Sequence, residues 1–164
     1  MVIVIIVSIL ALLGTYSVRK YVTASKTSEA TEMITMIKGA EESYKDETFA
    51  YLRISPMTSY FPFSSLPKGV KMSWDGGSGG ELALWNQLGV HPSTIVQFGY
   101  ACDAEGATIP DKGTLKISQD LNYPASAAHW FVVRAASDRD GNGIAATFVG
   151  SSFTDQIYGE NETE

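Results

Sequence analysis

The chain has 164 residues, which is enough for one domain of modest size and an additional N-terminal helix. Its formal net charge is −6, with 18 Asp and Glu against 12 Lys and Arg, and the lack of a basic patch in the sequence argues against nucleic acid as a partner. Cys102 is the only cysteine, so an intrachain disulfide is excluded, and the sequence has no C-x-x-C-H motif for covalent haem.

The first predicted element is an apolar helix at the N-terminus. Residues 1–18 contain no charged side chain, and the run ends at Arg19-Lys20. Its length is just sufficient for a helix to cross a bilayer. No small-residue cleavage site follows it, so we expect the segment to be retained rather than removed as a secretory signal. A retained apolar helix serves either to anchor a single-pass membrane protein or to pack with many copies in the core of a filament.

The helical pattern continues without a break into an amphipathic segment, residues 22–54. Apolar side chains recur at intervals of three and four, which predicts one buried face and a helix over residues 1–52 about 78 Å long at 1.5 Å per residue. Opposite charges one turn apart, such as Lys38 with Glu41 and Glu41 with Lys45, are expected to pair on the other side. The apolar face, called the apolar stripe below, consists of Ala30, Met33, Ile34, Ile37, Ala40 and Tyr44.

A globular head is predicted over residues 55–164. The helix must end before Pro56, because a residue that precedes proline avoids the helical conformation. Residues 53–80 are rich in proline and aromatic side chains, which belong against a core, and the glycine-rich residues 76–80 are expected to form a mobile loop tip. The head carries the whole net charge, since residues 1–55 have six basic and six acidic side chains.

The rest of the head predicts an α+β fold with an antiparallel sheet. A short helix is expected over residues 81–88, ending at Gly89. Alternating apolar residues indicate a sheet with one buried face, and the acidic residues 159–164 are expected to fray. The predicted strands are residues 94–101, 129–136 and 144–152, with a weaker one at 112–118.

Residues 137–143, SDRDGNG, give a strong signal for the turn of a hairpin. Asp138, Asp140 and Asn142 are weak candidates for a calcium site. The spacing does not fit an EF-hand loop, because glycine stands at the fourth place rather than the sixth and Val149 takes the place of the final carboxylate. We therefore expect these residues to shape a turn.

No set of residues has the pattern of an active site. His91 and His129 are the only histidines, and neither has a second metal ligand at the usual spacing. Residues 76–80 lack the Lys-Ser/Thr that follows a phosphate-binding loop, and no G-x-S-x-G elbow occurs. We expect no enzyme activity, no catalytic residue and no cofactor. Cys102 is expected to be a buried apolar side chain, with an intermolecular disulfide as the alternative.

The chain is also similar to a known family. Residues 1–21, MVIVIIVSILALLGTYSVRKY, resemble the N-terminal helix of bacterial type IV pilins. The Ile9-Leu10-Ala11 triplet and the Val18-Arg19-Lys20-Tyr21 exit resemble those of pilins from myxobacteria and deltaproteobacteria. Only this helix is a specific signature, although the similarity covers most of the chain. The similar head segments are residues 86–90, 98–100, 138–143 and 157–162.

Two features depart from the pilin pattern. The mature family chain begins with a methylated aromatic residue, followed closely by a glutamate that pairs with a neighbour's amine, whereas Met1 aligns just after that glutamate. We expect the sequence to lack its first few mature residues; the alternative is a subunit that assembles without this ion pair. Tyr16 takes the place of a proline that is frequent in the family, so unwinding of the helix in a fibre would depend on Gly14 and Thr15.

The resemblance implies a major structural subunit of a type IV pilus, a helical homopolymer that serves adhesion and twitching motility. Its domains would be a filament-core helix over residues 1–21, a stalk helix over 22–54 and a head over 55–164. The implied partners are other copies of the chain, the inner membrane before assembly and the pilus assembly machinery. The implied location is an extracellular filament at the cell surface. The expected assembly residues are Val4, Ile5, Ser8, Ile9, Ala11, Leu12, Gly14 and Thr15.

Two further interpretations stay open. A minor pilin or a type II secretion pseudopilin would share the fold and differ in copy number and location. A membrane-anchored extracytoplasmic binding module, with an acidic head that binds a cationic ligand, belongs to another class of protein.

Overall fold

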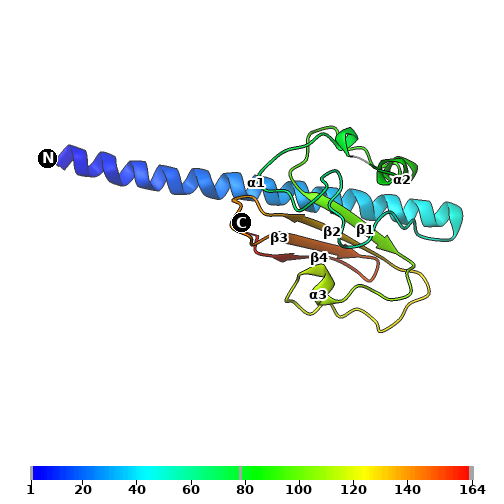
Figure 1. Ribbon diagram of the computed structural model, residues 1–164. Coiled ribbons are helices and arrows are strands. Elements are labelled where there is room, and N and C mark those ends of the chain that lie inside the picture. Colours follow the sequence, from blue (N-terminus) through cyan, green and yellow to red (C-terminus); the bar gives the residue numbers. More distant parts are fainter. Residues whose placement is uncertain (1, 78, 163–164) are drawn as a thin grey trace.

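The computed structural model describes the backbone of residues 2–77 and 79–162, and the side chains of the same residues except 16–26. The fold is α+β: a long N-terminal helix lies across one face of a four-stranded antiparallel sheet (Figure 1). The N-terminal part of this helix projects from the head, and the short elements α2 and α3 lie on opposite sides of the sheet (Figure 1).

Helix α1 spans Val2–Thr48 without interruption, which makes it about 70 Å long at 1.5 Å per residue. It ends four residues earlier than predicted. Phe49 adopts a left-handed conformation with φ of 64°, and its N–H donates to the carbonyl of Lys45 at 2.7 Å. The chain therefore reverses at Phe49 rather than at the proline that the sequence suggested as the stop.

The sheet is a simple meander in which each strand pairs with the next. The strands are β1 (Gly99–Ala104), β2 (Phe131–Ser137), β3 (Ala146–Ser151) and β4 (Thr154–Glu160), in spatial order β1-β2-β3-β4. The register aligns Tyr100 with Ala135 and Ala135 with Phe148. These three side chains therefore share one face of the sheet.

Two of the predictions for the head were wrong. Residues 112–118 do not form a strand, because Lys112–Leu115 is the short helix α3. The side chain of Asp111 caps this helix by accepting a hydrogen bond from the Thr114 N–H at 2.8 Å, and Lys116 closes it in the left-handed conformation. The acidic tail was expected to fray from residue 159, whereas Gly159 and Glu160 belong to β4.

The sheet is also buried on both faces rather than on one. Every residue of β1, β2 and β3 is buried. The face toward α1 carries Tyr100, Val133 and Phe148 in the larger core. The opposite face carries Val132 and Val149 in a second core, which is covered by residues from α3 and the segments around it, among them Leu115, Ile117, Leu121 and Trp130.

The connector between α1 and β1 lies against the core, as its aromatic content predicted. It contains the 3-10 helix η1 (Trp74–Gly76) and helix α2 (Glu81–Leu88), which ends at Gly89 as expected, with φ of 79°. Phe61 and Tyr100 exchange backbone hydrogen bonds of 3.0 and 2.7 Å, so the connector also covers the outer edge of β1. Trp74 packs edge-on against both Phe61 and Trp85, at centroid distances of 4.9 and 5.3 Å. Ser78 lies outside the described residues, so the expected mobility of the glycine-rich tip stays a prediction.

Candidate functional site

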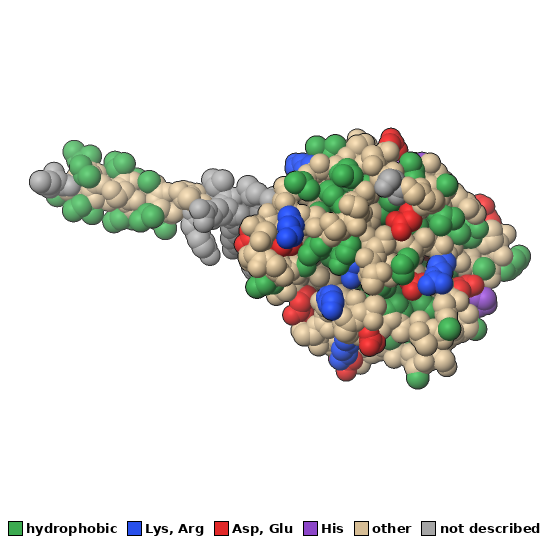
Figure 2. All heavy atoms as spheres, viewed as in Figure 1, with side chains coloured by type: hydrophobic (Ala, Val, Ile, Leu, Met, Phe, Trp, Pro, Cys, Tyr) green, Lys and Arg blue, Asp and Glu red, His purple; other side chains and the backbone are tan. Residues whose placement is uncertain are grey.

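The most unusual surface of the molecule is the projecting part of α1. Every described side chain from Val2 to Thr15 is exposed. Ten of them are large aliphatic residues whose exposed fractions range from 51% at Ile6 to 76% at Ile3. Figure 2 shows hydrophobic side chains along both edges of this segment, which the head does not cover. A globular chain rarely leaves such a surface exposed to water, and large apolar patches of this kind are typical of interaction sites.

All the predicted assembly residues lie on this projecting helix. Ser8 and Thr15 keep their hydroxyl groups satisfied within it, because each donates to a carbonyl one turn earlier, at 2.8 Å in both cases. The outer surface of the segment therefore presents alkyl groups with few free polar atoms. No other part of the described chain comes within 4 Å of a Cβ built on Gly14, so close approach by a second helix is sterically open there. The exposed assembly residues are Val4, Ile5, Ser8, Ile9, Ala11, Leu12, Gly14 and Thr15.

Among the described residues, no helix combines the length and the apolar character needed to cross a membrane. The predicted apolar run covers residues 1–18. Met1 and the side chains of residues 16–18 lie outside the part of the chain that the structure describes.

The second half of α1 is held by the head. Ala30, Ile34 and Ile37 are fully buried, Met33 is nearly so, and Ala40 and Tyr44 pack at the edge of the same core. The apolar stripe thus faces β2 and β3, both of which α1 contacts. One α-helix contributes both the uncovered apolar surface and a central layer of the head.

Helix α1 packs closely on the sheet at Gly150 of β3. A Cβ atom built on Gly150 would lie 2.5 Å from Cγ2 of Ile34 and 3.3 Å from Cδ of Lys38. Only glycine allows the helix to approach the sheet this closely. A glycine inside a strand often marks a close approach of another element, so Gly150 within the predicted strand 144–152 is a sequence signal for this contact.

The described polar side chains of α1 do not form the surface ion pairs that the sequence predicted, such as Lys38 with Glu41 and Glu41 with Lys45. Among the described residues, none of the three ion pairs involves α1. Glu29 instead accepts the Gln97 N–H at 2.7 Å, and Lys38 donates to the Thr154 carbonyl at 2.7 Å. These side chains tie the helix to the backbone of the head.

Glu41 is the most notable case, because it is fully buried. Its Oε2 accepts the Leu52 N–H at 2.9 Å, and its Oε1 lies 3.2 Å from the Sγ of Cys102, which donates to it. Burial raises the pKa of Glu41 to about 7, with Glu42 and Glu105 adding smaller repulsion. Sequence reasoning missed this residue, because its neighbours at one-turn spacing suggested an exposed ion pair.

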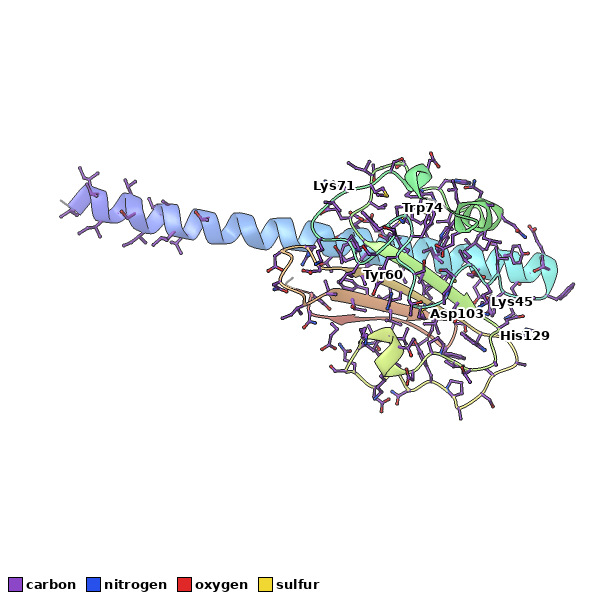
Figure 3. All side chains as sticks on the ribbon, viewed as in Figure 1. Lys45, Tyr60, Lys71, Trp74, Asp103 and His129 are labelled. Carbon is purple, nitrogen blue, oxygen red and sulfur yellow. The ribbon has the colours of Figure 1, made fainter. Side chains whose placement is uncertain are left out.

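The end of the head farthest from the projecting helix holds a network of polar contacts. Tyr51 Oη donates to Glu42 at 2.9 Å and accepts from Lys45 at 2.9 Å. The Tyr51 N–H donates to Glu105, which also contacts His129 at 2.8 Å. Lys45 and His129 lie at this end in Figure 3. The network holds the chain reversal after α1 in place.

The residues of the possible calcium loop are used in shaping the turn. Both oxygens of Asp138 accept backbone N–H groups, from Gly141 at 2.8 Å and Gly143 at 3.1 Å. Asp140 accepts from the backbone and the side chain of Asn142. No group of three metal-binding side chains occurs within the described part of the chain.

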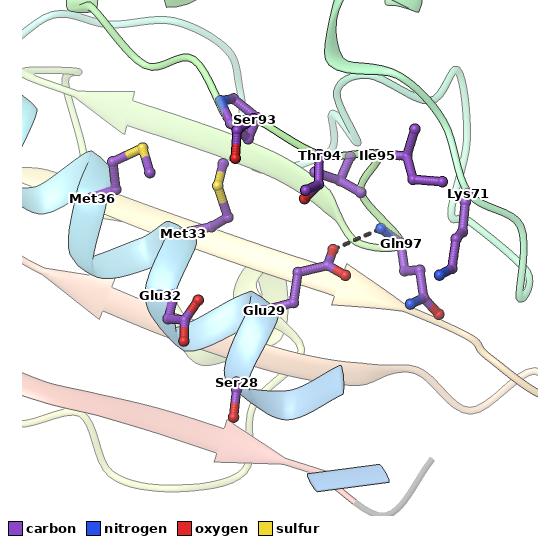
Figure 4. A pocket seen from close by; sticks show the side chains of 12 residues that line it. Ser28, Glu29, Glu32, Met33, Met36, Lys71, Ser93, Thr94, Ile95 and Gln97 are labelled. Carbon is purple, nitrogen blue, oxygen red and sulfur yellow. Dashed lines mark hydrogen bonds between the residues drawn. The ribbon is translucent and has the colours of Figure 1, made fainter. Parts of the chain in front are cut away.

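A cavity of about 500 Å³ lies between α1 and residues 92–97 (Figure 4). Glu29 lines it, but one of its oxygens is already taken by the Gln97 N–H. Met33, Met36 and Ile95 contribute apolar walls.

No protein-family model, curated protein or solved structure matches the chain. The projecting apolar helix is the feature with the largest energetic consequence, because covering an aliphatic side chain stabilises a complex by about 1.5–3 kcal/mol. That figure applies to a fully exposed side chain, and these ten residues are 51–76% exposed, so the gross gain is on the order of 10–20 kcal/mol.

Proposed function

We propose that the chain is a structural subunit of a type IV pilus, assembled by packing of its N-terminal helices. The observation that carries this proposal is the continuous α1, uncovered on all sides over Val2–Thr15 and fixed in the head over its second half. A second helix of the same kind offers the chemistry that such a surface needs. Many copies related by the same non-closing contact form a helical fibre.

The geometry supports assembly in three ways. The exposed aliphatic residues surround the helix rather than forming one seam, so several neighbours are needed to cover it. Small residues, among them Ser8, Ala11 and Gly14, allow neighbouring helices to approach closely. The acidic head keeps the outside of the assembly soluble. The gross gain from burial, on the order of 10–20 kcal/mol, offsets the cost of association, which is about 4–15 kcal/mol.

In this proposal the apolar helix resides in the inner membrane before assembly and in the filament core afterwards. The pilus assembly machinery transfers it between the two. The filament then acts outside the cell in adhesion and motility. The similarity of residues 1–21 to type IV pilins supports the choice of this filament class.

The test is assembly of the purified chain after detergent removal, followed by electron microscopy. The wild type should give regular fibres. Ile9→Lys and Leu12→Lys should give none, because an unpaired charge buried among apolar helices costs several kcal/mol. Ile144→Lys is the matched control, since Ile144 is a 50% exposed aliphatic residue on the head, and it should assemble normally.

Two other results of this experiment would argue against the proposal. Regular fibres from Leu12→Lys would show that the apolar helix is not the assembly core. Irregular aggregates from the wild type would favour a membrane-anchored binding module. Mass spectrometry of intact subunits in fibres sheared from cells would separate a major from a minor subunit by abundance, and would give the mature N-terminus.

A further inference from the structure

The side of the sheet opposite α1 contains a buried arginine. Arg134 occupies the middle of β2, between Ala101 of β1 and Val149 of β3 in the register. It is 2% exposed. Arginine is almost never fully buried in proteins unless its charge is paired, so its partners need to be accounted for.

The described residues satisfy this guanidinium only in part. Nη1 donates to the Thr114 carbonyl at 3.4 Å and Nη2 to the Ser59 carbonyl at 3.2 Å, which are long for hydrogen bonds of a charged group. The ring of Tyr60 lies 4.7 Å from Cζ. Nε is buried and has no hydrogen-bond partner, and none of the ion pairs in the described structure includes Arg134. Burial lowers the pKa of Arg134, and Tyr60 offsets part of this effect.

This arginine lies against a cavity of about 360 Å³ between the connector and α3. Lys116, in the left-handed conformation after α3, supplies a second positive charge. Asp111 is the one acidic group of the described lining, and its Oδ1 is engaged by the Thr114 N–H. The cavity is thus positive within a head that carries the whole negative charge of the chain. Its lining residues are Thr58, Tyr60, Asp111, Gly113, Thr114, Lys116 and Arg134.

We propose that this cavity is a binding site for a small organic carboxylate. The planar guanidinium has five N–H donors in a fixed fork, and a carboxylate matches this fork with two parallel hydrogen bonds. The ring of Tyr60 supports the guanidinium group through a cation–π contact, and Lys116 can contact a second oxygen or a second carboxylate. The volume is at the small end of ligand sites, which suits an acid of a few carbon atoms.

A ligand in this cavity would supply the negatively charged partner that Arg134 lacks among the described residues. A bound carboxylate would pair the buried charge and give short, charge-assisted hydrogen bonds in place of the two long ones to carbonyl groups. The site is independent of the projecting helix, because it lies on the face of the sheet opposite α1. Binding therefore does not require filament assembly.

The test is a titration of the ¹⁵N-labelled full chain, dispersed in detergent, with sodium glutarate at constant ionic strength set by chloride. The amide signals of Tyr60, Gly113 and Thr114 should move in a saturable way. Arg134→Lys keeps the charge but loses the fork, and should weaken glutarate binding about tenfold. Lys116→Ala should weaken it about threefold, since this charge is exposed. Lys68→Ala removes an exposed lysine outside the cavity and should leave binding unchanged.

Three results would overturn the proposal. One is a response that does not saturate in the wild type, and another is equal affinity in the wild type and Lys116→Ala. The third is tighter binding of inorganic phosphate than of glutarate under the same conditions, which would reject the carboxylate assignment. If Arg134→Lys does not fold, the wild type and Lys116→Ala still decide the question, because Lys116 is exposed and its replacement does not disturb the core.

Discussion

The Sγ of Cys102 lies 3.2 Å from Oε1 of Glu41, so a strand of the sheet and the long helix meet through a buried thiol and a buried carboxyl group. Neither group has access to water in the structure. A carboxylate in such a place is costly, which is why burial raises the pKa of Glu41 to about 7. The burial of Glu41 therefore predicts that the stability of the head depends on pH near neutrality.

We predict that the head loses stability as the pH rises from about 5 to about 8. The pKa of Glu41 in the folded chain is above its ordinary value of 4.5, so the folded chain keeps a proton that the unfolded chain releases. The stability contributed by this group is full below that ordinary value and is lost as the pH rises through about 7. The total loss is about 3 kcal/mol.

Glu41→Gln should remove this pH dependence, because an amide is neutral throughout and can still accept the Leu52 N–H. Thermal unfolding of the chain in detergent, followed by tryptophan fluorescence between pH 5 and pH 9, measures the effect. Glu47→Gln replaces an exposed residue of the same helix and should behave as the wild type. Parallel curves for the wild type and Glu41→Gln would contradict the prediction.

Cys102 should resist alkylation in the folded chain. Burial raises the pKa of its thiol well above the ordinary value, with Glu41 adding to the effect, and the reactive thiolate is therefore suppressed. Iodoacetamide at pH 8 should modify less than a few per cent of the folded chain, and all of it in guanidinium chloride, as measured by mass spectrometry. Rapid modification of the folded chain would reopen the possibility of an intermolecular disulfide.

Gly150→Ala should destabilise the head by about 1–3 kcal/mol, because the added methyl group overlaps a buried branched side chain of α1. Chemical unfolding of both chains measures the difference. Gly39→Ala is a control on the facing helix, where an added Cβ meets nothing, and it should be neutral or stabilising by about 0.5–1 kcal/mol. The cost of Gly150→Ala should shrink in an Ile34→Ala background, and simple additivity would argue against a direct clash.

Asp138→Ala should destabilise the head by about 1–3 kcal/mol, because two buried or part-buried backbone N–H groups lose their acceptor. Millimolar calcium and excess chelator should both leave the melting temperature of the wild type unchanged. A rise of several degrees with calcium would reverse this assignment, since a ligand that binds the folded state must stabilise it. The exposed Asp155 offers a matched control as Asp155→Ala.

In an assembled fibre we expect non-helical backbone somewhere between Ser8 and Tyr16. The single chain is helical throughout α1, but glycine weakens a helix by about 1 kcal/mol relative to alanine. Gly14 is followed by β-branched Thr15, whose hydroxyl bonds back to the Ala11 carbonyl. A fibre map with unbroken helical hydrogen bonding from Ile3 to Lys20 would refute this expectation while leaving the filament assignment intact.

Much of the fold could be predicted because its elements have clear periodicity. The spacing of Ala30, Ile34 and Ile37 predicted the buried face of α1, and Gly89 marked the end of α2. Strands β2 and β3 followed from their apolar residues and from the turn between them. These features are local, so the sequence around each element contains the necessary signal.

Other features depend on contacts between distant segments. Strand β4 has a polar sequence, TDQIYGE, and it is a strand because β3 offers a free edge. Helix α3 has four residues, too few for a periodic signal, and depends on the cap from Asp111. The burial of Glu41 and Arg134 could not be predicted, since charged residues are exposed in most contexts and only the packed structure shows what covers them.

The close approach of α1 to Gly150 has a mechanical consequence. Because one unbroken helix forms both the projecting tail and a layer of the head, tension on the tail passes directly into the sheet without crossing a linker. The branched side chain of Ile34 seated over Gly150 resists sliding of the helix along its axis. A fibre of such subunits under load would therefore lengthen in its tails, while the heads keep their shape.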